Sequence, residues 1–245
     1  MFFDDYPRFL LTSTTANDPR RLGIRYRGMF ETNAHIFPGA KVLDIASHDG
    51  RWSFAASKLG AASVTGIEVR SEMVKHAEDN FAEYGVPHEA YRFINDDVFD
   101  VLKDREGNNL DVDVVLCLGF IYHTLRYQDL FAGVRALNPR YFLIDSAVIL
   151  ADRPFVRVKL EDTTKEAAGA DHTFGAEGNM VTGQPSSSAL ELMLNAHGFT
   201  VVNKFDWPAF IDEHFPDEES VQSYYSGRRL TWLCEPSVES RLTDS

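Results

Sequence analysis

The stretch from Lys41 to Arg70 restricts what this chain can fold into more than any other part of the sequence. It opens with a short apolar run, residues 42–46, which has the length and β-branched content of a fully buried strand. A tight turn follows, and then apolar residues at helical spacing up to Gly60, which is placed to end a helix. A second apolar run, residues 63–67, ends on Glu68. The pattern predicts a strand–turn–helix–strand unit of a doubly wound α/β sheet.

The same unit predicts a ligand. In a doubly wound sheet the turn after the first strand lies where the strand order reverses, and ligands bind there. An acid at the end of the second strand can hold the two hydroxyl groups of a ribose. Glu68 closes an apolar strand and needs a polar partner, which argues against the alternative of a βαβ unit without a ligand. We therefore expect a nucleotide-type cofactor.

The stretch resembles motifs I and II of the class I S-adenosylmethionine (SAM)-dependent methyltransferases. In that family an apolar strand and an Asp precede Gly-x-Gly-x-Gly. Here Asp44 is kept, Ala46 and His48 replace the first two glycines, and Gly50 keeps the third. The string DIASHDGRWSF also resembles a subgroup related to the wobble-uridine methyltransferases. The resemblance implies a Rossmann-like sheet of seven strands in the order 3-2-1-4-5-7-6, with strand 7 antiparallel and helices on both faces.

The resemblance also implies which residues hold SAM and release S-adenosylhomocysteine (SAH). They come from the ends of the first four strands and from the helix that precedes them. The expected residues are Arg25, Asp44, Ala46, Ser47, Gly50, Trp52, Glu68, Val69, Asp97, Val98, Leu118 and Gly119.

Two of these assignments have alternatives. Asp97 would accept a hydrogen bond from the adenine amino group, with Asp96 as its rival, or it would only cap the short helix over residues 98–102. Arg25 or Tyr26 would contact the methionine carboxylate, or Arg25 would belong to a solvated basic face.

Composition limits the class of protein and its partners. With 245 residues, 44% hydrophobic and 25% charged, residues 1–245 are expected to form one globular domain. A formal charge of −13 weighs against a nucleic-acid surface, although a local basic patch can be hidden in that total. We expect no membrane partner and a cytoplasmic location, because no run of about 18 apolar residues and no signal peptide is visible. A homo-oligomer is left open.

Both cysteines are expected to be free thiols. Cys117 and Cys234 fall in predicted strands that would lie two positions apart in the sheet, roughly 10 Å from each other. That separation exceeds the reach of a disulfide bond.

Two segments lie outside the alternating pattern. Residues 1–38 are expected to form an N-terminal arm and helices that cover the cofactor. Residues 147–185 contain a run, 155–161, that alternates like a half-exposed strand, followed by a polar segment. A long connection at the ligand end of such a sheet usually holds the substrate. We therefore expect a substrate-binding insertion, with a variable surface insertion as the alternative.

The candidate catalytic residues are His123, Asp145 and His172. SAM supplies an electrophilic methyl group, but a hydroxyl acceptor must lose its proton. His123 follows the fourth strand and is the candidate base, with a structural histidine as the alternative. Asp145 would orient His123, or would join Asp171, His172 and Glu177 in holding Mg²⁺.

Three functions follow. The first is O-methylation of a saccharide or another small hydroxylated acceptor, by an enzyme similar to those that act on methylated-mannose polysaccharides. The second is methylation of tRNA, for which residues 20–27 and 228–229 supply arginines. The third is a protein that binds SAM without catalysis.

Overall fold

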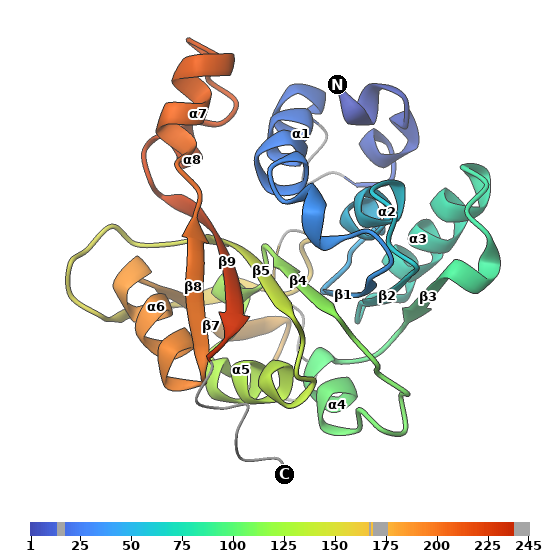
Figure 1. The fold of residues 1–245 in the computed structure, drawn as a ribbon. Coiled ribbons are helices and arrows are strands. Elements are labelled where there is room, and N and C mark those ends of the chain that lie inside the picture. Colours follow the sequence, from blue (N-terminus) through green and yellow to red (C-terminus); the bar gives the residue numbers. More distant parts are fainter. Residues whose placement is uncertain (14–17, 167, 169–175, 238–245) are drawn as a thin grey trace.

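A seven-stranded sheet forms the centre of the computed structural model, which describes residues 1–13, 18–166, 168 and 176–237 (Figure 1). Its order is β3-β2-β1-β4-β5-β9-β8. The strands are β1 (Lys41–Ile45), β2 (Ser63–Ile67), β3 (Tyr91–Ile94), β4 (Val114–Leu118), β5 (Tyr141–Ala147), β8 (Phe199–Lys204) and β9 (Arg229–Pro236). Strands β1 to β5 are parallel, and β9 is antiparallel to both β5 and β8. The predicted Rossmann-like fold is confirmed.

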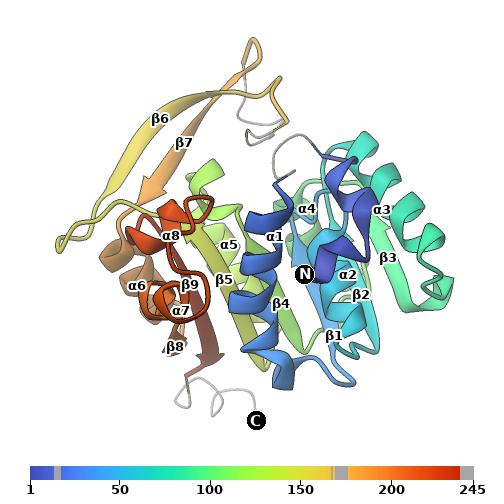
Figure 2. The same ribbon diagram turned by 90° about the horizontal axis from the view of Figure 1, so that it is seen from above.

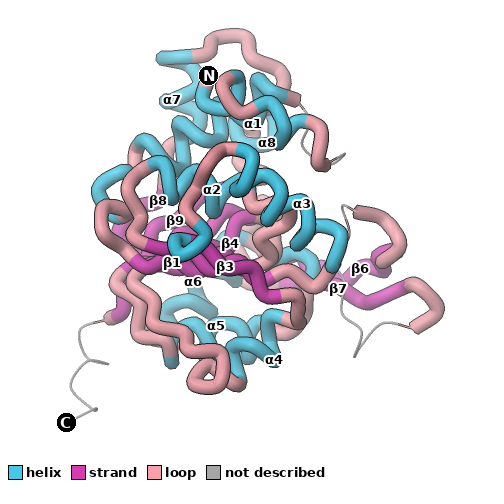
Figure 3. The backbone as a smooth tube through the Cα atoms, turned by 90° about the vertical axis from the view of Figure 1, so that its right-hand side faces the viewer, coloured by secondary structure: helices cyan, strands magenta, loops and turns pink. Residues whose placement is uncertain are grey.

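Helices cover both faces of this sheet. They are α1 (Pro19–Tyr26), α2 (Arg51–Lys58), α3 (Ser71–Glu83), α4 (Val98–Lys103), α5 (Tyr127–Ala136), α6 (Ser187–Ala196), α7 (Trp207–His214) and α8 (Gln222–Tyr225). Figure 3 shows α1, α2, α3, α7 and α8 on one side of the sheet and α4, α5 and α6 on the other. None of the helices in the described part of the chain has the length and apolarity needed to span a membrane.

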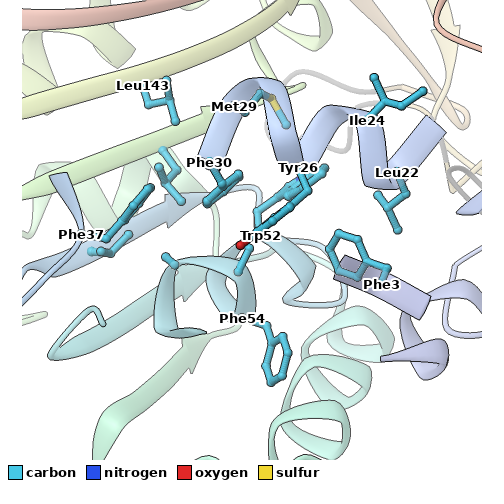
Figure 4. Packing of buried hydrophobic residues seen from close by; sticks show 14 of the residues in the cluster. Phe3, Leu22, Ile24, Tyr26, Met29, Phe30, Phe37, Trp52, Phe54 and Leu143 are labelled. Carbon is cyan, nitrogen blue, oxygen red and sulfur yellow. The ribbon is translucent and has the colours of Figure 1, made fainter. Parts of the chain in front are cut away.

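Each face of the sheet carries its own core. Side chains alternate along a strand, so Val114 and Leu116 of β4 pack into one core while Val115 and Cys117 pack into the other. The core under α1 and α2 is rich in aromatic rings, as Figure 4 shows. Cys117 and Cys234 are both buried and free, and β5 separates their strands as predicted.

The N-terminal segment packs on this aromatic core. Phe3 is fully buried and contacts the ring of Trp52 edge-on, with 5.7 Å between the ring centroids. Helix α1 starts at an Asp18 cap and continues into a π-helical turn, Arg27–Glu31, and a 3-10 turn, Ala34–Ile36. Residues 19–36 therefore form a broken helix rather than one continuous helix.

A separate β-hairpin interrupts the alternation after β5. It consists of β6 (Val156–Asp162) and β7 (Asn179–Pro185) and projects from the rest of the molecule in Figure 2. Its base is fixed by hydrogen bonds on Gly183, which donates to the Thr124 carbonyl (3.2 Å) and accepts from Tyr127 Oη (2.6 Å). The sequence predicted β6 but missed β7, because a run with Gly and Pro has low strand propensity.

Candidate functional site

A cavity of about 280 Å³ lies at the carboxyl ends of the parallel strands. Its wall brings together loops after β1, β2, β3 and β4, together with parts of α1, β7 and β9. This is the edge at which the sheet order reverses and where ligands are expected. The predicted residues that line it are Arg25, Ala46, Trp52, Glu68, Val69, Asp97, Val98, Leu118, Gly119 and His123.

The loop after β1 follows the backbone path of a glycine-rich turn without most of its glycines. Ala46 and His48 have φ values of +54° and +55°, and Gly50 has +79°. These are the three positions at which the family motif has glycine. A left-handed conformation costs an ordinary residue about 1–2 kcal/mol, so the surrounding structure must hold it in place. The loop also passes close to β2, because a Cβ on Gly66 would lie 2.6 Å from Ser47 Oγ.

Glu68 joins this loop to the end of β2. The residue is only 4% exposed and lines the cavity. Its Oε2 accepts a hydrogen bond from the backbone N–H of His48 (3.1 Å), and its Oε1 accepts one from the N–H of Arg70 (2.9 Å). Each carboxylate oxygen can accept a second hydrogen bond. Glu68 therefore fixes the loop and keeps acceptor capacity toward the cavity.

Asp44 at the end of β1, and Ser47 and Gly50 within the loop, are not among the residues that line the cavity. Asp44 is buried, and its Oδ2 accepts a hydrogen bond from Ser53 Oγ at 2.7 Å. Burial raises the pKa of Asp44 to about 7. In this structure the three residues support the loop rather than the cavity wall.

Asp97 is a helix cap that also lines the cavity, and its hydrogen bond to adenine stays a prediction. Its Oδ1 accepts a hydrogen bond from the backbone N–H of Phe99 at 2.7 Å, so it caps helix α4. It also lines the cavity, as does its rival Asp96.

His123 is held by the hairpin. Its Nδ1 lies 2.7 Å from Glu161 Oε2 on β6, and Glu161 also forms an ion pair with Lys159. The ring lines the cavity after β4. With Nδ1 bonded to a carboxylate, Nε2 is the nitrogen that can exchange a proton with a ligand.

Asp145 does not orient His123. It is fully buried, and its Oδ1 accepts hydrogen bonds from Arg229 Nε (2.6 Å) and Arg25 Nη2 (3.3 Å). Burial raises the pKa of this carboxyl, but the charges of Arg229 and Arg25 outweigh burial and lower the pKa below its ordinary value. The expected orienting contact is replaced by Glu161, because Asp145 is saturated by arginines.

Two members of the expected Mg²⁺ cluster, Asp171 and His172, lie outside the described residues, so the cluster stays a prediction. Of the other two, Glu177 is exposed and Asp145 is buried. Within the ranges that the structure describes, no group of three His, Cys, Asp or Glu side chains has the arrangement of a metal site.

Sequence reasoning missed several residues of the site, chiefly Arg51, Arg70 and the supporting Glu161. Arg51 forms a bidentate pair with Asp49, with two N–O distances of 2.7 Å. Their adjacency in the string DGRW was the available signal. The others depend on contacts between distant parts of the chain.

Part of this chain is similar to known methyltransferases. Residues 42–139 match the family model described as a methyltransferase domain. The ribosomal RNA large subunit methyltransferase of Deinococcus radiodurans is 31% identical over 78 residues, which are 32% of this chain and 19% of that protein. The chain spans 19–28% of the length of the first curated relatives that it matches.

Solved structures share the fold. The magnesium protoporphyrin IX methyltransferase of Synechocystis PCC 6803 with bound SAH has a TM-score of 0.58 at 16% identity, over 96% of this chain and 94% of that one. The N-terminal domain of EvdMO1, in the presence of SAH and D-fucose, has the same score and identity over 90% and 84%. Residues 42–139 are thus similar to a methyltransferase domain, and the fold of the chain is the one that SAM-dependent methyltransferases share.

Proposed function

We propose that this protein is a SAM-dependent methyltransferase that acts on a hydroxyl group of a sugar or another small acceptor. One observation carries the proposal: a single cavity is lined both by Glu68, at the nucleoside end, and by His123, at the end where a base is needed. A site for the cofactor and a site for proton removal therefore open into the same space.

The residues at the nucleoside end fit SAM. Glu68 would accept hydrogen bonds from the ribose hydroxyls, and Asp97 or Asp96 would accept one from the adenine amino group. Val98 and Leu118 supply apolar wall for the adenine ring. When bound, SAM supplies a methyl group on a positively charged sulfur.

The residues at the other end fit a hydroxyl acceptor. His123 Nε2 would take the hydroxyl proton, while Glu161 at Nδ1 holds the ring orientation and stabilises the positive charge that the ring gains. The hairpin contributes Met180 to the cavity wall, and residues 147–185 would thus bind substrate. The EvdMO1 domain, studied with D-fucose, supports a sugar as the acceptor.

RNA is the second candidate. The relative from Deinococcus radiodurans is named as a ribosomal RNA methyltransferase, and its likeness extends over 78 residues of this chain. Against RNA stands the formal charge of −13, because RNA-binding surfaces are normally basic.

Transfer of tritiated methyl from SAM into separated pools tests the proposal. The pools are small polar saccharides, bulk tRNA and ribosomal RNA, each with and without EDTA. We expect label in the saccharide pool, and loss of that label with EDTA would indicate a metal site. Label only in RNA would replace the first candidate by the second. SAM binding without label in any pool would favour a non-catalytic protein.

A further inference from the structure

Charge is distributed unevenly along the cavity. On one side of β1, three acids that follow β2 and β3 outnumber the one arginine there; the acids are Glu68, Asp96 and Asp97, and the arginine is Arg70. Arg21, Arg25 and Arg229 line the other side, next to β4 and β5. In the strand order these two groups lie on opposite sides of the switch point. The acidic end matches the nucleoside, so the basic end faces the space left for the acceptor.

The basic end carries more positive charge than its neighbours neutralise. Arg25 and Arg229 share one carboxylate, Asp145. Arg21 donates instead to neutral oxygens, the Ser220 carbonyl and Ser223 Oγ. Three guanidinium groups thus face one carboxylate among the described residues. Burial lowers the pKa of Arg21, and the charges of Arg25 and Arg229 lower it further, which shows that the three groups interact.

The arginine groups lie where an acceptor would bind. Arg229 Nη1 donates to Tyr122 Oη at 3.2 Å, and Tyr122 precedes His123. Arg229 Nη2 lies beside Gly119 at the end of β4, where an added Cβ would come within 3.2 Å of it. Each terminal nitrogen carries two N–H groups, so donors remain for a ligand.

We propose that Arg21 and Arg229 form an anion subsite that binds a carboxylate or phosphate group of the acceptor. The inference rests on the proposed function and narrows the acceptor to an anionic one. With a neutral acceptor, Arg21, Arg25 and Arg229 would have only the Asp145 carboxylate to balance their charge, because their other partners are neutral oxygens. The planar guanidinium fork matches both carboxylate and phosphate.

The composition supports a dedicated site. The chain has a formal charge of −13, yet three of its 24 lysines and arginines gather at the basic end of this cavity within the described part of the chain. All three, Arg21, Arg25 and Arg229, are arginines. A chain that repels anions overall would need such a local concentration to bind one.

The melting temperature of the SAH-bound protein tests the proposal. Two probes, inorganic phosphate and acetate, are added in increasing concentration, and sodium chloride keeps the ionic strength constant and serves as the reference salt. The variant is Arg21→Gln, and Arg21→Lys retains the charge. Arg20→Gln is the matched control, because the neighbouring Arg20 is exposed and pairs with Glu218 on the surface.

We expect phosphate, acetate or both to raise the melting temperature of the wild type and of Arg20→Gln, and the more effective probe identifies the group. In Arg21→Gln the required probe concentration should rise about tenfold, and Arg21→Lys should recover most of the response. No ion-specific shift in the wild type, or an unchanged shift in Arg21→Gln, would overturn the proposal. A tenfold loss of SAH affinity in Arg21→Gln would also overturn it, since Arg21 would then hold the cofactor. Failure of every variant to bind SAH would instead reject the proposed function.

Discussion

Ala46 and His48 occupy backbone conformations that normally belong to glycine. Their φ values near +55° reproduce the path of the family's glycine-rich turn, although the glycines are absent. The strain is held by hydrogen bonds such as that from the His48 N–H to Glu68. The sequence therefore departs from the motif while the backbone keeps it.

Replacing Ala46 by Gly should stabilise the protein. Relief of a left-handed Ala gains about 1–2 kcal/mol, and the greater freedom of Gly in the unfolded chain removes part of it. We expect a net gain of about 0.5–1 kcal/mol in the free energy of unfolding, measured with urea. Gly50→Ala is the opposite control, since Gly50 has φ +79° and its added Cβ would lie 3.0 Å from Ala77 Cβ. A loss of stability in Ala46→Gly would refute the strain at this position.

Asp44 should make stability depend on pH. Burial keeps its pKa at about 7 in the folded protein, whereas an unfolded Asp releases its proton near pH 4. Between these two pH values the folded protein binds more protons than the unfolded protein does. The contribution of Asp44 to the free energy of unfolding therefore falls as pH rises. Asp44→Asn should therefore gain stability relative to wild type between pH 4 and 8, on the order of 2 kcal/mol.

Urea unfolding at several pH values measures this difference. Asp212→Asn, on the exposed face of α7, is the control and should show no such trend. A constant difference between Asp44→Asn and wild type across the range would mean that Asp44 is ionised throughout.

At the level of elements, the β6–β7 hairpin supplies the carboxylate that contacts His123. Glu161 on β6 holds His123, which follows β4, and the two residues are 38 positions apart. No local pattern reveals such a pair, so the sequence assigned the orienting role to Asp145. Apolar runs and turn residues sufficed to predict most strands and helices, because they report burial and chain reversal locally. The order of the strands came from the family resemblance.

Glu161→Gln should lower kcat about 10- to 100-fold and leave the affinity for SAM within about twofold of wild type. The amide cannot stabilise a positively charged His123 ring as a carboxylate does. His123→Ala should reduce kcat at least as much. Steady-state kinetics and calorimetry provide the two readouts. Glu177→Gln, on the exposed part of the same hairpin, is the control. Unchanged kcat in both variants at pH 7 would make His123 a structural residue.

For the molecule as a whole, the two ends of the cavity differ in how far sequence could predict them. The nucleoside end comes from consecutive segments between β1 and β4, where motif spacing places Glu68 and Asp97. The acceptor end joins α1, β5 and β9. Arg229 and Asp145 there are 84 residues apart, and only the folded sheet brings them together.

Calorimetric titration of SAM into wild type, Glu68→Ala and the control Glu78→Ala tests the central claim most directly. Glu78 is exposed on α3, so its loss should leave affinity unchanged. Removing the carboxylate of Glu68 deletes charge-assisted hydrogen bonds, and we expect affinity to fall about 10- to 100-fold. Equal affinities in all three proteins would contradict a cofactor site built on Glu68 in this cavity.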